Sequence, residues 1–142
     1  MQVRPYLYFN GRCEEAVDFY QKALGAEVLM LLRFKDSADA PPPGLLPAAT
    51  EDKIMHVCFR VGETELMASD GDCEGQTSFE GFSLSVSPAT DAEAERLFNA
   101  LADGGQVQMA LEKTFWASCF GLVTDRFGVC WMVSVANEAE SN

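Results

Sequence analysis

This sequence is poor in histidine and has no long apolar run. It contains a single histidine among 142 residues, and no stretch of about eighteen apolar residues that could cross a membrane as a helix. Its first residues, Met1 to Pro5, lead directly into a strand-like segment and lack the basic-then-apolar pattern of a signal peptide. We therefore expect a cytoplasmic protein with no membrane partner.

Paired cysteine spacings and positive charge are also scarce. The five cysteines are an odd number without CxxC spacing, which argues against a disulfide framework and against a structural zinc site. Ten basic residues stand against 22 acidic ones, and the net charge of -12 would repel the phosphates of nucleic acids. Apolar residues make up 48% of the chain, so it can bury a core.

What the sequence does contain is a pattern of elements that occurs twice. Apolar residues recur at helical spacing over Glu14–Leu24 and again over Asp91–Ala102. Gly25 and the Gly104-Gly105 pair follow these segments as C-terminal caps, and Asp91 is the expected N-cap of the second helix.

Short strands and a hairpin surround each predicted helix. The expected strands before and after the helices are Tyr6–Phe9 and Val28–Phe34, then Phe82–Val86 and Val107–Leu111. The expected hairpin turns are Gly62–Glu65 and Asp125–Gly128. The order β-α-β-β-β thus occurs twice, which indicates a duplicated module and an α+β domain.

The repeat divides residues 1–142 into parts of one domain. Module one covers about residues 1–72, module two about 80–136, and a polar tail occupies 137–142. The segment Asp36–Asp52 holds four of the six prolines and is predicted to be an extended loop, either mobile or laid over a site.

Alternating residues give each predicted sheet one apolar face and one mixed face, with Trp131 on the apolar face that a helix covers. In the second hairpin, a four-residue turn would place Thr124 opposite Val129, so that Cys119 and Met132 share the mixed face. Such a face either lines a ligand cleft or is simply solvated, as in many one-sided antiparallel sheets. The predicted ligand-binding residues on these mixed faces are Arg4, Tyr6, His56, Arg60, Ser69, Cys119 and Met132.

Two segments resemble the vicinal oxygen chelate superfamily of glyoxalases, bleomycin-resistance proteins and dioxygenases. Its strand-helix opening is similar to YLYFNGRCEEAVDFYQKALGAEV, and its PhnB-like branch is similar to KTFWASCFGLVTDRFGVCWMVSV. The resemblance covers nearly the whole chain. It implies two βαβββ modules that form an open curved-sheet cleft, with helices on the outer face, in a homodimer.

Metal-using members of this superfamily take His or Glu ligands from the first and last strand of each module. The matching positions here are Arg4 or Pro5, Gly81, Ser69 or Met67, and Met132. Arginine, glycine and methionine do not supply the converging donors that a divalent metal needs. We therefore expect no metal and no cofactor at the usual superfamily site.

His56 has several competing interpretations. It is either hydrogen-bonded within the sheet without a function, or it acts with Arg60 to bind an anionic ligand. Proton transfer is a third role, although the sequence supplies no orienting partner. The matching position in the second half is Cys119, which allows a His/Cys pair across the cleft or a cysteine nucleophile without a visible base.

Three functions follow from these observations. The favoured one is a metal-free, PhnB-like protein that binds a small aromatic or anionic molecule. The alternative is a glyoxalase- or dioxygenase-type enzyme with a non-standard metal ligand set. A methyltransferase label is sometimes attached to PhnB-like sequences, but this chain lacks the glycine-rich strand-to-helix turn typical of nucleotide-like cofactors.

Overall fold

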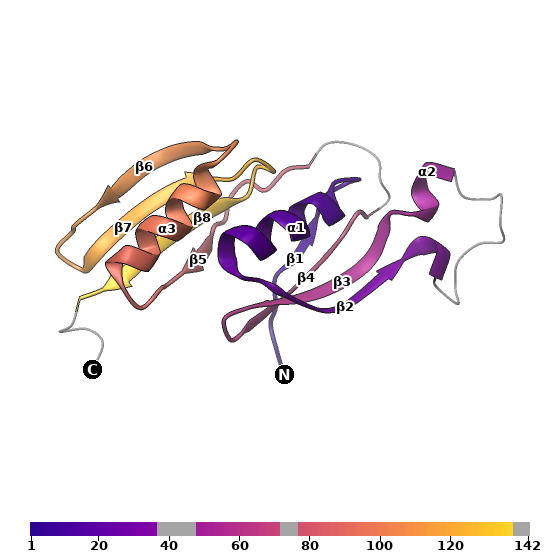
Figure 1. Cartoon of the computed structure of the whole chain (residues 1–142), viewed down its shortest axis with the longest axis horizontal. Coiled ribbons are helices and arrows are strands. Elements are labelled where there is room, and N and C mark those ends of the chain that lie inside the picture. The colour runs from indigo at the N-terminus through magenta and orange to yellow at the C-terminus, as the bar shows by residue number, and fades with distance from the viewer. Residues whose placement is uncertain (37–47, 72–76, 138–142) are drawn as a thin grey trace. The chain divides into compact units, whose positions relative to one another are not determined.

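The computed structural model describes residues 1–36, 48–71 and 77–137. They belong to two compact units, Met1–Thr77 and Ser78–Asn142, and each unit contains a four-stranded sheet with a helix on one face (Figure 1). The predicted α+β architecture with two βαβββ modules is confirmed. Of the Pro-rich segment, residues 37–47 lie outside the described residues, as do 138–142 of the tail.

Seven elements lie in the described residues of module one. They are β1 (Tyr6–Tyr8), α1 (Cys13–Leu24), β2 (Glu27–Arg33), the 3-10 helix η1 (Phe34–Asp36), α2 (Ala48–Glu51), β3 (Ile54–Val61) and β4 (Thr64–Ser69). The strand order is β1-β4-β3-β2, with β1 parallel to β4 and the other pairs antiparallel. The sequence predicts an extended loop over Asp36–Asp52, but the structure has the short helices η1 and α2 at the two ends of this segment.

Module two repeats this arrangement with a much shorter connection between its second and third strands. Its elements are β5 (Leu84–Val86), α3 (Asp91–Ala102), β6 (Gln106–Glu112), β7 (Ala117–Thr124) and β8 (Cys130–Ala136). The strand order β5-β8-β7-β6 matches that of module one, and β5 is again parallel to its neighbour β8. The N-cap of α3 is Thr90 rather than Asp91, because the Thr90 hydroxyl accepts a hydrogen bond from the Glu93 backbone N–H at 3.1 Å.

The apolar face of each sheet packs against its own helix. In module one, Tyr20 of α1 lies between the rings of Phe9 and Phe59, with ring centroids 6.3 and 6.1 Å away. In module two, Phe98 of α3 and Trp131 of β8 are buried on the same side as Val133. The predicted helix-side position of Trp131 is therefore correct. No helix in the described part of the chain is long and apolar enough to cross a membrane.

A buried carboxylate stabilises each module. Asp70, which follows β4, accepts hydrogen bonds from the backbone N–H groups of Gly11, Cys13 and Ile54 at 2.7–2.8 Å. Asp125, which follows β7, accepts bonds from three further donors. Both side chains are at most 3% exposed, so these bonds replace the water that the carboxylates lose on folding.

The connection between β7 and β8 is one residue longer than the sequence predicted. Thr124 pairs with Cys130 rather than lying opposite Val129, so five residues join the strands. Asp125 organises this connection: its side chain accepts the N–H groups of Phe127 and Val129, and its own N–H bonds to the Val129 carbonyl. The extra residue shifts the predicted register of β7 by one position.

Candidate functional site

The mixed face of module one carries a row of alternating charges. This charged row, one residue from each strand or its flank, is Arg4, Glu65, Arg60 and Glu27. Arg4 donates to Glu65 at 2.8 Å and Arg60 donates to Glu27 at 2.5 Å. Exposed pairs of this kind add little stability, but each arginine already has a carboxylate partner. The structure therefore does not favour Arg60 as a cation reserved for an anionic ligand.

The next row on the same face contains aromatic and sulfur-bearing side chains. Tyr6 pairs with Met67, Met67 with Cys58, and Cys58 with Met30, in successive strands. Thioethers and thiols are polarizable and adaptable, and they contact aromatic rings favourably. This row is suited to a flat apolar ligand rather than to a strongly charged one.

Tyr6 supplies the orienting partner that the sequence did not reveal for His56. The Tyr6 hydroxyl lies 3.0 Å from His56 Nδ1, and the Tyr8 ring lies 5.0 Å from that of Tyr6. When the hydroxyl donates, Nδ1 accepts and the neutral imidazole carries its proton on Nε2. Ser69 is different, because it is 3% exposed and its hydroxyl accepts from the Gly71 N–H at 3.1 Å. It supports the turn after β4.

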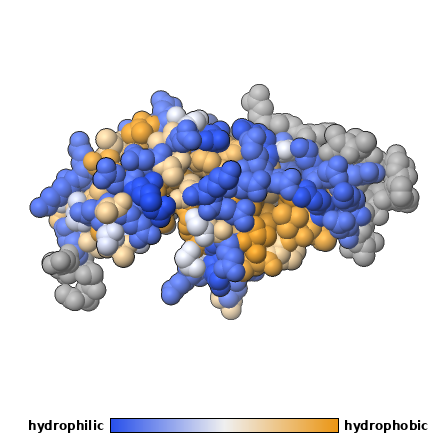
Figure 2. Space-filling view, in the orientation of Figure 1, coloured by the Kyte–Doolittle hydropathy of each residue, from blue (hydrophilic) through white to orange (hydrophobic). Residues whose placement is uncertain are grey.

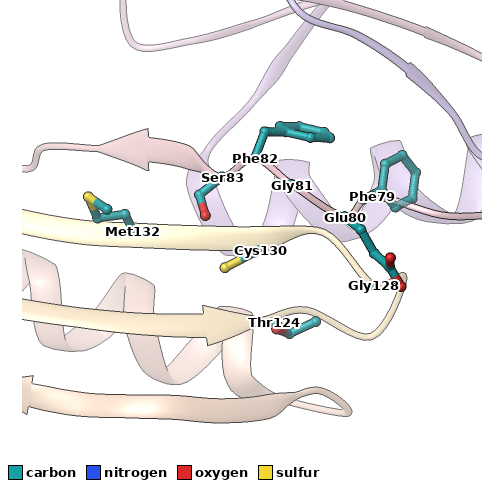
Figure 3. A pocket seen from close by; sticks show the side chains of 9 residues that line it. All are labelled: Phe79, Glu80, Gly81, Phe82, Ser83, Thr124, Gly128, Cys130 and Met132. Atoms are coloured by element: carbon teal, nitrogen blue, oxygen red, sulfur yellow. The ribbon is translucent and has the colours of Figure 1, made fainter.

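Module two has a pocket on its mixed face, with a volume of about 790 Å³. It lies between the segment that leads into β5 and the strands β7 and β8 (Figure 3). Its lining residues are Phe79, Glu80, Gly81, Phe82, Ser83, Thr124, Gly128, Cys130 and Met132. The volume falls within the range of about 300–1,000 Å³ that small-molecule sites occupy. Met132 is the predicted site residue that lines this pocket.

The sequence predicts Cys119 on this face, and that placement is wrong. The longer turn pairs Cys119 with buried Val135, on the side of the sheet that α3 covers. Burial raises the pKa of the Cys119 thiol, and the carboxylates of Asp91 and Glu95 on α3 raise it further. A raised pKa opposes thiolate formation, so the site does not favour a nucleophile.

The position in module two that matches His56 is Phe120, not Cys119. Cys58 and Leu122 occupy the same place in their sheets, each between two methionine-bearing strands, and His56 and Phe120 each stand two residues earlier. Phe120 contacts the Trp116 ring with centroids 5.4 Å apart. The predicted His/Cys pair across the two modules therefore has no basis.

The residues at the usual metal positions do not fit a divalent ion. The predicted first-strand positions, Arg4 or Pro5 and Gly81, precede β1 and β5. The residues that the first and last strands pair are Tyr6 with Met67 in module one and Ser85 with Met132 in module two. A phenol, a hydroxyl and two thioethers are poor donors for such ions. Within residues 1–36, 48–71 and 77–137, no three His, Cys, Asp or Glu side chains group as a ligand set.

Comparison with known proteins identifies the family. The model of the 3-demethylubiquinone-9 3-methyltransferase family matches residues 1–134. The chain belongs to this PhnB-like family. Protein YjdN of Escherichia coli (strain K12) is 38% identical, over 97% of each chain. The crystal structure of protein PA1353 from Pseudomonas aeruginosa is 48% identical with a TM-score of 0.82, over 96% of this chain and 98% of that one.

Other solved structures place this PhnB-like chain in the vicinal oxygen chelate fold. A Bacillus cereus protein, described as a putative 3-demethylubiquinone-9 3-methyltransferase, PhnB protein, is 26% identical, with a TM-score of 0.78 over 96% and 100% of the two chains. The fosfomycin resistance protein FosX from Mesorhizobium loti is 10% identical, with a TM-score of 0.63 over 99% and 95%. This last likeness concerns the fold alone.

Sequence reasoning missed the residues that form one wall of the pocket. Phe79, Glu80 and Phe82 precede β5, where the sequence predicts the end of a linker and the start of a strand. The alternation of that strand predicts Phe82 on the apolar face, yet Phe82 is 46% exposed. The sequence signal that could have indicated this wall is the presence of two phenylalanines close to Glu80 in a segment without helical periodicity.

Proposed function

We propose that this PhnB-like protein is a cytoplasmic binding protein that holds a small, partly aromatic molecule without a metal ion. The pocket of module two is the observation that carries the proposal, since its volume and its two phenylalanines suit a small aromatic ligand. The Tyr6–Met67–Cys58–Met30 row offers a second surface of similar character in module one.

A thermal-shift screen of small aromatic compounds tests this function. A compound at about 100 times its Kd stabilises the folded protein by about 2.7 kcal/mol, which raises Tm by roughly 5–10 °C. Met132→Glu should abolish the shift, because the new carboxylate enters the pocket. Met109→Glu is the matched control: Met109 faces the same side of the sheet but does not line the pocket. A screen without hits, or hits that both variants retain, would contradict the proposal.

Enzymatic alternatives find less support. The paired residues of the first and last strands, Tyr6, Met67, Ser85 and Met132, are poor metal ligands, as described above. The methyltransferase label of the family likewise finds little support. Nucleotide-like cofactors usually bind to a doubly wound parallel sheet, whereas each of the two described sheets has one parallel strand pair and is otherwise antiparallel. If the protein catalyses proton transfer, we expect His56 to be the proton-transferring residue and the Tyr6 hydroxyl to orient its ring.

We expect the protein to form a homodimer. The edge strand β2 exposes three consecutive apolar residues, Leu29, Met30 and Leu31, each 36–47% exposed. An apolar area over the strands of module one is visible beside α1 (Figure 2). Exposed apolar edge strands are favourable places for a second copy to pack. Sedimentation should give twice the monomer mass of 15.5 kDa, and a monomer at micromolar concentration would contradict the prediction.

A further inference from the structure

The pocket of module two contains a negative side chain and no positive one. Glu80 is the charged residue among its lining residues, and its side chain is exposed. It belongs to none of the ion pairs found in the described part of the chain. A ligand entering this pocket therefore meets a carboxylate that no basic side chain of module two is seen to pair with in the described residues.

The basic residues of module two are placed elsewhere. Residues 78–142 contain nine acidic residues against three basic ones, a formal charge of -6. Arg96 lies 3.9 Å from Glu93 on the surface of α3, and Arg126 donates to Asp103 at 3.1 Å. Lys113 follows β6 and does not line the pocket. The net charge of the whole module thus reinforces the negative charge at the pocket.

Aromatic rings flank the carboxylate along the chain. Phe79 and Phe82 both line the pocket, and Figure 3 shows the Glu80 carboxylate beside Gly128, on the same segment that carries the two rings. The faces of aromatic rings attract cations, with contributions of about 0.5–2 kcal/mol. Cys130 and Met132 also line the pocket, and their polarizable sulfur atoms are favourable contacts for an aromatic ring.

We infer that this pocket selects aromatic organic cations, such as a planar ring bearing an amine or a quaternary ammonium group. The carboxylate of Glu80 pairs with the charge, and Phe79 and Phe82 hold the ring and the cation together. This inference rests on the proposed function and adds the sign of the ligand's charge to it. It replaces the anionic ligand that Arg60 suggested, since Arg60 is paired with Glu27 in module one.

Three dyes of comparable aromatic size and different charge test the inference by fluorescence titration. Thioflavin T is cationic, Nile red is neutral and anilinonaphthalene sulfonate is anionic. We expect affinity to fall in that order, and the affinity for thioflavin T to weaken as sodium chloride is raised, because salt screens exposed charges. Glu80→Gln should reduce thioflavin T affinity about fivefold to tenfold and leave Nile red affinity unchanged.

Glu63→Gln is the matched control for net charge. It removes one carboxylate from the β3–β4 turn of module one, so thioflavin T affinity should stay as in the unchanged protein. If Glu80→Gln and Glu63→Gln behave alike, or if the three dyes bind equally, the inference is wrong while the binding function stands. If no dye binds saturably, the proposed function itself fails. Unchanged Tm values of both variants verify that the fold is intact.

Discussion

Replacing Asp70 with alanine is expected to lower the free energy of unfolding of module one by about 4 kcal/mol. The change removes the acceptor for three backbone N–H groups, those of Gly11, Cys13 and Ile54. Each buried donor left without a partner costs about 1–3 kcal/mol. Urea unfolding followed by circular dichroism measures the loss as a lower midpoint with little change in slope.

Two further variants separate hydrogen bonding from charge at Asp70. Asp70→Asn keeps one acceptor oxygen but turns an NH₂ group toward backbone donors, so an intermediate loss is expected. Asp52→Ala removes an exposed carboxylate of the same module that is ion-paired with Lys35, and it should leave the free energy of unfolding almost unchanged. Equal losses for Asp70→Ala and Asp52→Ala would show that Asp70 acts only through net charge.

Replacing Gly105 with alanine is expected to cost about 3 kcal/mol and to lower Tm by roughly 6–12 °C. A Cβ at Gly105 would stand 2.2 Å from the carbonyl oxygen of Thr124 and 3.0 Å from backbone atoms of Asp125. Backbone atoms cannot rotate out of the way as the tip of a side chain can. The segment at the start of β6 must therefore move away from the end of β7. Scanning calorimetry measures the change directly.

Gly62→Ala is the control for conformational strain without a clash. Gly62 has φ of 58°, and no atom lies within 4 Å of the place that a Cβ would occupy, so alanine there should cost only about 1–2 kcal/mol. If Gly105→Ala proved as mild as Gly62→Ala, the close approach of β6 to the β7–β8 turn would be refuted. The sequence indicates Gly105 only as part of a helix end.

The helices and the order of helices and strands along the chain could be predicted because their signals are local and repeated. Gly25 ends α1 in the left-handed conformation with φ of 69°, and α3 spans Asp91–Ala102 as the apolar spacing indicated. The second turn could not be predicted from spacing, since four- and five-residue connections both join hairpins. The side chain of Asp125 decides between them by bonding to the turn's own backbone.

The side-chain pairings at the site were not predicted because the paired residues are distant in sequence. Arg4 meets Glu65, and Arg60 meets Glu27, only because the sheet order brings four strands into one row. The hydroxyl of Tyr6 reaches His56 for the same reason. Residue types on the mixed face were predictable from alternation in module one, but their pairings depend on register across strands.

The two sheets let the chain be compared with itself, position by position. Met30 and Met109 occupy one matching place, and Met67 and Met132 occupy another. Beside these shared thioethers, module one has Tyr6 where module two has Ser85. The two modules thus share their flexible methionine side chains and differ in the polar residues beside them. We therefore expect their two surfaces to accommodate ligands of similar shape but to differ in selectivity. Such a pair of surfaces suits two unlike ligands.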